Sequence, residues 1–440
     1  MPVAPEETAD RNEVANHGRD RLGDARQHDV GNNLIMPLTT RREFLHLSGC
    51  ATIAAASVTA QTAKYDMLIK GGRVIDADQR LNRIADVAIA NGRIARLQAD
   101  LAASEAKTVI DARGKLVTPG LVDIHAHIDD MPPSHCLSTG VTSLVDAGSR
   151  GADNVDAVIA TAKAAPNRVR VLLNLGRTGL GGRGELLDFA HADVAAARTA
   201  IEAHRDTIIG IKARLSRSVA GDRDLEAIDR AHEVTVPLGL QLMVHVGQTT
   251  SPMSSIVRRL RAGDIVTHIY ASPPNGILDE DGRVFPDVLV ARRRGIVFDI
   301  GNGRNGHITW EVAERALQQG FLPDTISSDL TQPGRKDRVF DFPTVISKFL
   351  LLGMSLDQVI AAATTNAARA IHPFRDCGTL RVGAIADVAI FELRTGEFEF
   401  VDNVKATRVG TQKLVPAGVV VGGRYLMPTT IESGPRSGSA

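Results

Sequence analysis

The short motif with most chemical meaning in this chain is His125-Ala126-His127, which ends the apolar run Leu116–Ile124. Successive side chains of a β-strand point to opposite faces, so residues two apart share one face. Two imidazoles on one face can chelate a single metal ion. A histidine pair alone is weak evidence, so the metal hypothesis depends on finding further ligands elsewhere in the chain.

Length, charge and cysteine usage limit the possible functions. The chain has 440 residues, of which 43% are hydrophobic, and its 51 Lys+Arg balance its 51 Asp+Glu. A neutral chain has no field to attract nucleic acid or an anionic membrane, and no apolar stretch reaches the roughly 18 residues of a membrane span. Cys50, Cys136 and Cys377 share no short spacing, which excludes a cysteine zinc cluster and a disulfide framework. A metal would therefore need nitrogen and oxygen ligands.

Between residues 118 and 377 short apolar strands alternate with helix-length segments such as Asn154–Ala165 and Val194–His204. The eight strand candidates are Leu121–His127, Val141–Gly148, Val169–Gly176, Ile208–Leu215, Gln241–Gly247, Asp264–Ala271, Ile296–Asn302 and Thr325–Leu330. Eight such units predict an α/β fold, a (β/α)8 TIM barrel over residues 118–377. The active site of such a barrel lies at the carboxyl ends of its strands.

Short alternating strands with glycine turns flank the predicted barrel on both sides. The Asn91-Gly92 dipeptide is a strong hairpin signal in the first flank. We expect residues 64–117 and 378–427 to build one small β-sandwich domain together, so that both ends of the chain contribute to it.

Residues that can bind a metal collect at the ends of the predicted strands. They are His125, His127, Lys212, His245, His268 and Asp329. The remaining histidines are predicted in the N-terminal tail, helices or loops. Because the carboxyl ends of barrel strands meet at one rim, we expect these six side chains to form one site.

With these residues the chain resembles the amidohydrolase superfamily, over roughly residues 64–427. The matching features are the run Pro119–His127 together with the strand-end lysine, histidines and aspartate. The runs Gly140–Ser149 and Pro323–Leu330 resemble the bacterial amidohydrolase/deacetylase subgroup, which is often labelled dihydroorotase-like. The resemblance implies a hydrolase with two divalent metal ions, and zinc is the expected metal.

The resemblance also implies a division of the ligands between the two metals. His125 and His127, with Asp329, would hold the more buried ion. His245 and His268 would hold the second ion. A water bridging two metals about 3.5–4 Å apart loses a proton near neutral pH and becomes the attacking hydroxide.

Lys212 is the unusual member of the set, because an ammonium group between two dications would be repelled. Burial and nearby metals lower a lysine pKa, and a neutral amine can add carbon dioxide to give an anionic carbamate. The resemblance implies that Lys212 is N6-carboxylysine and bridges both metals. Asp329 is the expected catalytic residue, accepting the proton of the hydroxide and delivering it to the leaving group.

Four further residues are candidates for substrate binding. Arg177 follows the third strand and can form a fork to a carboxylate, and Tyr270 follows His268 by two residues. Asn302 and His307 belong to a glycine-rich segment after the seventh strand.

We expect cleavage of an amide or ester acyl bond in a small, carboxylate-bearing acylated substrate. The alternatives are a dihydroorotase-type cyclic amidase and an N-acyl-D-amino acid deacylase with one metal. Dihydroorotases resembling this pattern carry an arginine two residues after the second histidine, where this chain has Asp129. A non-catalytic scaffold predicts gaps in the ligand set, and none is present. The sequence leaves homo-oligomer formation open.

The N-terminal region resembles an export signal. Residues Arg41-Arg42 precede Phe44-Leu45 and a weakly apolar run that ends at Ala60, which is the order of a twin-arginine signal. We expect residues 36–63 to be this signal and the mature protein to be periplasmic, with a cytoplasmic location as the alternative.

Three further expectations concern the chain ends. The run Leu47–Cys50 also resembles a lipoprotein acylation box, but almost no apolar stretch precedes it, so this interpretation ranks lower. Residues 1–35 are polar and are expected to be disordered, or to precede a true start at Met36. Residues 428–440 are expected to be a disordered tail.

Overall fold

The fold is that of a computed structural model, which describes residues 63–181 and 185–427. The predictions for residues 1–35, for the export signal up to residue 62 and for the tail 428–440 lie outside the described residues. Within them, no helix combines the length and the apolar content that a bilayer crossing requires.

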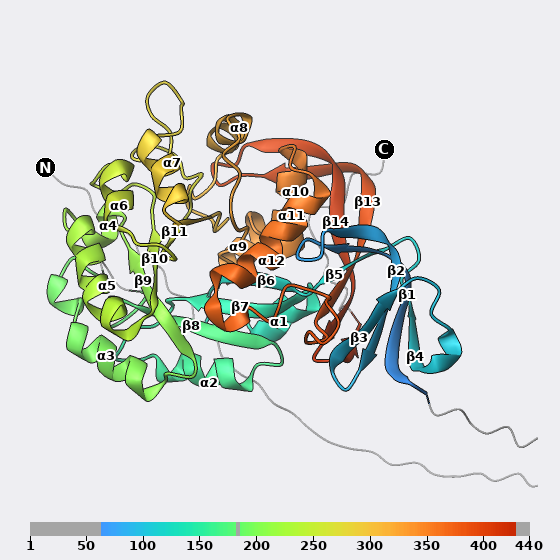
Figure 1. The fold of residues 1–440 in the computed structure, drawn as a ribbon. Helices are drawn as coiled ribbons and strands as arrows, with labels where there is room; N and C mark the ends of the chain where they lie inside the picture. The colour runs from blue at the N-terminus through green and yellow to red at the C-terminus, as the bar shows by residue number, and fades with distance from the viewer. Residues whose placement is uncertain (1–62, 182–184, 428–440) are drawn as a thin grey trace, which may run out of the picture. The chain divides into compact units, whose positions relative to one another are not determined.

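Seven parallel strands form a curved sheet in chain order, and together they make the wall of a barrel (Figure 1). They are β6 (Leu121–Ala126), β7 (Val141–Ala147), β8 (Arg168–Asn174), β9 (Ile208–Arg214), β10 (Gln241–His245), β11 (Ile265–Thr267) and β12 (Val297–Asp299). Each overlaps one of the first seven predicted strands, so the α/β fold with a parallel barrel sheet is confirmed.

The eighth predicted strand is reduced to two isolated parallel bridges. Thr325 pairs with Asp299 of β12, and Leu330 pairs with Ala126 of β6. Between them the backbone N–H of Asp329 donates to the carbonyl of His125 at 2.6 Å. The segment 325–330 therefore closes the ring between the last and the first strand, although it is not a continuous strand.

Several strands end earlier than predicted because the backbone turns into the left-handed region. Gly247 has φ +123° shortly after β10, and His268 has φ +72° immediately after β11. Asp329 has φ +48° inside the closing segment. A residue with positive φ cannot continue a strand, so these positions break the ladder at the rim of the barrel.

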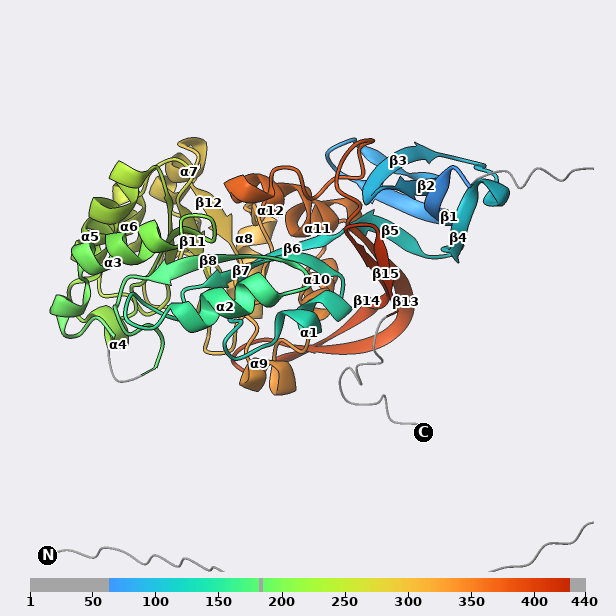
Figure 2. The ribbon, with the colours of Figure 1, turned by 90° about the horizontal axis from the view of Figure 1, so that it is seen from below.

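Helices follow the strands and cover the outside of the barrel. They are α1 (Pro133–Ser138), α2 (Asp156–Ala164), α3 (Val194–Ala203), α4 (Arg217–Ala220), α5 (Asp224–Leu238), α6 (Met253–Arg259), α7 (Pro286–Arg293), α8 (Trp310–Gln318), α9 (Gln332–Asp337), α10 (Phe342–Leu351), α11 (Leu356–Ala363) and α12 (Thr365–Ala370), with short 3-10 turns η1 (Ala103–Glu105), η2 (Phe189–His191) and η3 (His372–Phe374). Both predicted alanine-rich helices are present as α2 and α3. The helix α2 lies along β8 and buries Val158, Ile159 and Ala162, which share one helical face (Figure 2).

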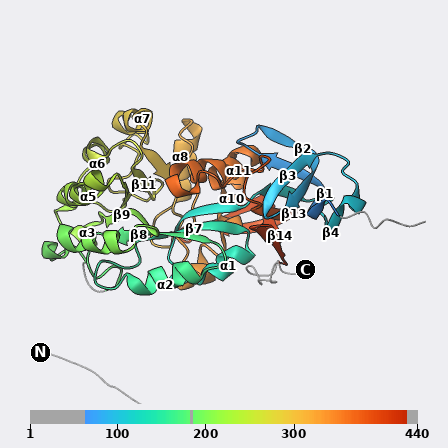
Figure 3. The same cartoon turned by 60° about the horizontal axis from the view of Figure 1, so that its bottom comes forward.

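A second sheet combines strands from both ends of the chain (Figure 3). Its strands are β1 (Tyr65–Asp76), β2 (Leu81–Ala90), β3 (Arg93–Gln98), β4 (Ala106–Asp111), β5 (Leu116–Pro119), β13 (Val388–Val401), β14 (Thr407–Val421) and β15 (Arg424–Leu426). The joint contribution of both ends agrees with the expectation. Hydrogen bonding connects all eight strands into one sheet through β5, so a sandwich of two separate layers stays a prediction.

Candidate metal centre

A cavity of about 390 Å³ opens at the carboxyl ends of the barrel strands. The predicted ligands that line it are His125, His127, Lys212, His245 and Asp329. His268 is fully buried behind them, with its ring centroid 4.2 Å from that of His245. The structure therefore brings all six predicted ligands together.

The donor atoms form two overlapping groups. One nitrogen or oxygen from each of His125, His268 and Asp329 lies within 4.8 Å of the others. The same holds for His245, His268 and His307. His268 belongs to both groups. Donor atoms that bind one metal ion lie about this far from one another, so each group could hold an ion.

The hydrogen bonds of His268 define its tautomer. Its Nδ1 is 2.7 Å from the carbonyl oxygen of Gly301, which can only accept, so Nδ1 carries the proton. Its Nε2 is then a bare acceptor, and it is buried with no hydrogen-bond partner among the described residues. A buried lone pair without a partner is unfavourable in a protein interior, and a metal ion would satisfy it.

His125 is held in the same way through Thr267. The Thr267 hydroxyl donates to Oδ2 of Asp299 at 2.7 Å, so its oxygen accepts from Nδ1 of His125 at 2.9 Å. The Nε2 atom of His125 therefore faces the cavity without a proton. This carboxylate–hydroxyl–imidazole chain is the outer-shell support that metal-binding histidines commonly have.

His127 has an equivalent chain built from the neighbouring strand. The Ser149 hydroxyl donates to Oδ2 of Asp146 at 2.6 Å, and its oxygen accepts from Nδ1 of His127 at 2.8 Å. The Nε2 atom of His127 is 3.1 Å from Oδ1 of Asp329. Three imidazoles thus present Nε2 to one centre.

Burial decides the charge of the cluster. It holds the pKa of His125, His245 and His268 well below the ordinary histidine value, so these rings are neutral at pH 7. Burial opposes ionisation of Asp329, but nearby His125 and the hydrogen bonds from His127 and His307 outweigh it and lower the pKa of this carboxyl. Neutral imidazoles and an ionised carboxylate are the forms in which these side chains bind divalent metals.

Lys212 is buried within this cluster. Its Nζ donates to Nε2 of His125 at 3.0 Å. Burial is the main cause that lowers the pKa of Lys212 to about 7, and the carboxylates of Asp329 and Asp299 oppose the shift. A large share of the amine is therefore neutral near physiological pH, which is the state that reacts with carbon dioxide.

The backbone around the cluster is strained and closely packed. His268 and Asp329 both have positive φ, which bulky or branched side chains rarely adopt. Gly303 has φ +48°, and a Cβ placed there would lie 2.1 Å from Nδ1 of His307 and 2.2 Å from Oδ2 of Asp329. Only glycine fits this position, so the loop after β12 lies directly against the site. Strain of this kind gathers at functional sites.

The predicted substrate-binding residues have different positions. His307 lines the cavity, and its Nδ1 is 3.0 Å from Oδ2 of Asp329. Arg177 is outside the cavity lining and forms a two-point ion pair with Asp153. The buried Tyr270 donates its hydroxyl to the carbonyl of Phe321 at 2.8 Å.

Asn302 is also buried away from the cavity lining, where its side-chain oxygen accepts from Nζ of Lys348 at 2.9 Å. Of the four residues, the structure brings His307 alone to the cavity.

Sequence reasoning missed several residues of the site. The hydroxyls of Thr267 and Ser149 orient imidazoles, and each is adjacent to or within a strand-end motif that was already recognised. Arg214 also lines the cavity, two residues after Lys212 on the same strand, a spacing that could have revealed it.

Asp129, the residue two positions after His127, forms an ion pair with Arg150 at 2.9 Å.

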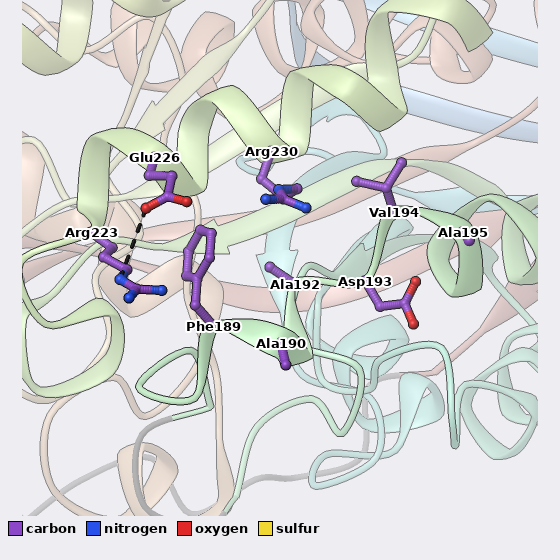
Figure 4. Close-up of a pocket in the computed structure, with 9 residues that line it drawn as sticks. All are labelled: Phe189, Ala190, Ala192, Asp193, Val194, Ala195, Arg223, Glu226 and Arg230. Carbon is purple, nitrogen blue, oxygen red and sulfur yellow. Dashed lines mark ion pairs between the residues drawn. The ribbon is translucent and has the colours of Figure 1, made fainter.

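A second hollow, of about 530 Å³, lies on the outside of the barrel near the start of α3 and beside α5 (Figure 4). Phe189 lies in it beneath the guanidinium groups of Arg223 and Arg230, whose carbons are 5.2 and 5.6 Å from the ring centroid. Arginine stacking on an aromatic ring explains this arrangement as local packing.

The protein is an α/β-barrel protein with a set of donor atoms suited to metal ions. Its closed parallel barrel and the imidazole–carboxylate cluster at the strand ends define this class. Residues 116–426 match the Amidohydrolase family, so the chain belongs to that family. It is a hydrolase that acts on C–N bonds.

Curated relatives share most of the chain. A deacetylase of Enterococcus faecalis is 30% identical over 370 residues, which cover 82% of this chain and 98% of that protein. A deacetylase of Brucella anthropi is 32% identical over 308 residues, which cover 67% of this chain and 75% of that protein.

Solved structures agree with this family. A crystal structure of an adenine deaminase has a TM-score of 0.76 and 30% identity, and covers 82% of this chain and 100% of its own. A crystal structure of a dihydroorotase has a TM-score of 0.76 and 29% identity, and covers 84% of this chain and 99% of its own.

Proposed function

We propose that this amidohydrolase is a binuclear metal-dependent deacetylase, which cleaves the amide or ester acyl bond of a small carboxylate-bearing substrate. The carrying observation is the convergence of three Nε2 atoms, from His125, His127 and His268, on the carboxylate of Asp329 and the amine of Lys212. The names of the Enterococcus and Brucella relatives support deacetylation.

The donor set fits two divalent ions, with zinc as the proposed metal. His125, His127 and Asp329 would hold one ion, and His245 and His268 the other. Lys212, as a carbamate, would bridge them. When bound, the ions would activate a water molecule and polarise the acyl oxygen.

The chain's own residues carry out the proton transfer. Asp329 would take the proton of the attacking water and give it to the leaving nitrogen or oxygen as the acyl bond breaks. The hydrogen bond from His307 orients this carboxylate toward the cavity. The Thr267 hydroxyl keeps the proton of His125 on Nδ1, and the Ser149 hydroxyl orients the ring of His127.

A dihydroorotase-type cyclic amidase is the second candidate, because a dihydroorotase shares this fold at 29% identity. Asp129 opposes it, since this position holds a carboxylate, paired with Arg150, in place of the arginine that would bind the carboxylate of dihydroorotate. An N-acyl-D-amino acid deacylase remains the third candidate.

A hydrolysis screen tests the proposal. Zinc-loaded protein is given N-acetyl amino acids and O-acetyl hydroxy acids of both hands, together with dihydroorotate and adenine. We expect turnover of an acetylated acid. Preference for dihydroorotate or adenine would replace the proposal, and selective turnover of N-acyl-D-amino acids would support the third candidate.

We also propose export to the periplasm, on the pattern that follows Arg41-Arg42. Cell fractionation with N-terminal sequencing tests it. A cytoplasmic protein that retains residues 41–60 would contradict the proposal.

A further inference from the structure

Arg214 is the last residue of β9, and it lies two positions beyond Lys212. Alternation along a strand places both side chains on the same face, which is the inner face of the barrel. Both residues line the cavity at the strand ends. The Arg214 side chain is 28% exposed, so it borders the cavity above the buried ligands.

The buried carboxylate of Glu185 binds the guanidinium of Arg214. Nη1 of Arg214 is 3.2 Å from Oε2 of Glu185, whose side chain is only 2% exposed. The other oxygen of Glu185 accepts from Nδ2 of Asn174 at 3.3 Å, and Asn174 is itself bonded to the carbonyl of Gly148. The support of Arg214 is therefore anchored in the interior of the barrel.

The guanidinium keeps most of its donors available. Arginine carries five N–H donors, and Glu185 takes up one nitrogen. Among the described residues, no other hydrogen bond to the Arg214 guanidinium is found. A planar fork with two parallel N–H groups matches the geometry of a carboxylate.

The other arginines that come into question are already engaged. Arg304 lines the cavity, but its Nε and Nη2 both bond to Asp337. Arg177 bonds to Asp153 through the same two atoms and lies outside the cavity lining. Arg214 thus combines a position in the cavity with an open fork.

We propose that Arg214 binds the carboxylate of the substrate and that Glu185 is the positioning residue that fixes its guanidinium. This inference rests on the proposed function and deepens it, because it places the acid group of the substrate next to β9 and the acyl group near Asp329. Specificity for acetylated acids over their neutral analogues follows from this single contact.

The test compares charged and neutral forms of one ligand. N-acetylalanine and N-acetylalaninamide of both hands are titrated calorimetrically into zinc-loaded Asp329→Asn protein, which should keep its zinc but lack turnover, and into the same protein that also carries Arg214→Gln or Arg177→Gln. The Asp329→Asn parent is expected to bind the acid more tightly than the amide. Arg214→Gln should weaken binding of the acid by about 10–100-fold, the range for a charged hydrogen-bonded pair, and change the amide by less than about threefold.

Arg177, the other arginine that was predicted to bind the substrate carboxylate, provides the control. We expect Arg177→Gln to preserve the preference for the acid. A selective loss in Arg177→Gln, an equal loss for both ligands in Arg214→Gln, or a parent protein without preference for the acid would each overturn the proposal. Binding is measured without turnover, so an absence of hydrolysis would count against the proposed function alone.

Further variants separate recognition from folding. Arg214→Gln leaves Glu185 buried without its partner, which can destabilise the protein. The double variant Arg214→Gln/Glu185→Gln removes both charges and should show the same selective loss at two zinc ions per chain. Glu185→Gln alone keeps the guanidinium and should raise KM for the acid several-fold with kcat unchanged. A fall in kcat with unchanged KM would contradict the positioning role.

Discussion

Nδ1 of His307 lies 3.0 Å from Oδ2 of Asp329, while Oδ1 of the same carboxylate lies 3.1 Å from Nε2 of His127. Both oxygens of Asp329 are therefore oriented by histidines from different parts of the chain. This arrangement aims one carboxylate at the centre of the cavity, where the proposed chemistry needs a proton acceptor.

Asp329→Asn tests the acid–base role. An amide keeps the size of the side chain and one oxygen donor but cannot accept the proton, so zinc content should stay nearly unchanged while kcat falls by about 10²–10⁴-fold. Metal analysis and steady-state kinetics on the same preparation measure both quantities. Retained turnover would contradict the role of Asp329.

The two-metal proposal predicts about two zinc ions per chain after loading. Chelator dialysis should abolish activity, and zinc with bicarbonate should restore it. A full activity at about one zinc per chain would instead favour the one-metal deacylase.

Carboxylation of Lys212 is separately observable. Protein loaded in the presence of ¹³C-bicarbonate should give a carbamate carbonyl signal by NMR, and Lys212→Met should lack it. The same signal in Lys212→Met would assign the carbamate to a different amine.

The Thr267 hydroxyl links Asp299 to His125, so its removal should weaken metal binding. Thr267→Val is expected to lower zinc affinity by about 10–100-fold, the usual effect of losing such an outer-shell partner. Thr325→Val is the matched control, because the Thr325 hydroxyl donates to the other oxygen of Asp299 at 2.7 Å without a bond to an imidazole. Equal effects of both variants on zinc affinity would show that the contact with His125 has no special importance.

Gly303→Ala should damage the site as well as the fold. Gly114→Ala provides the control, because Gly114 also has positive φ, at +75°, with nothing within 4 Å of an added Cβ. The control should lower the free energy of unfolding by about 1 kcal/mol, the usual cost of a left-handed alanine, and leave activity intact. Gly303→Ala should cost more and abolish turnover. Denaturant melts and kinetics compare the two, and full activity of Gly303→Ala would be inconsistent with the packing around Asp329.

Much of the site was predictable from strand positions. The parallel barrel collects its carboxyl ends at one rim, so His125, His245, His268 and Asp329 could be grouped without knowing any loop. Loop residues carry no such rule. Arg177 was expected near the substrate because it follows a strand, but Asp153 holds it outside the cavity lining. The partner of Arg214 was equally hidden, since Glu185 belongs to a loop without periodicity.

Strand lengths were overestimated for a related reason. Apolar residues lie on both sides of His268 and Asp329, so the sequence pattern favours longer strands. The positive φ values that place these side chains in the site end the ladder instead. The requirements of the site override the local pattern at these positions.

Lys348 provides a test of stability against pH. It is fully buried and donates to Asn302 and to the carbonyl of Arg338, and burial lowers its pKa from 10.5 to about 7. Between these values the unfolded chain binds one proton more than the folded chain. The free energy of unfolding should therefore rise with pH, by about 1.4 kcal/mol per pH unit for this group.

Lys348→Met should remove this rise, because methionine does not titrate. Denaturant melts of zinc-loaded wild type and variant between pH 7.5 and 9.5, values chosen to lie inside the window of about 7 to 10.5, measure the difference in slope. Parallel slopes would mean that Lys348 is charged in the folded protein.

Asn403, in the turn between β13 and β14, accepts the backbone N–H groups of His307 and Ile308 at 2.8 and 3.1 Å. The first of these bonds joins residues 96 positions apart. A ribosome produces the N-terminal part first, so all six proposed metal ligands emerge before the residue that fastens the His307 loop. The nascent enzyme thus completes its site only late in translation, after β13 and the turn that carries Asn403 have been made.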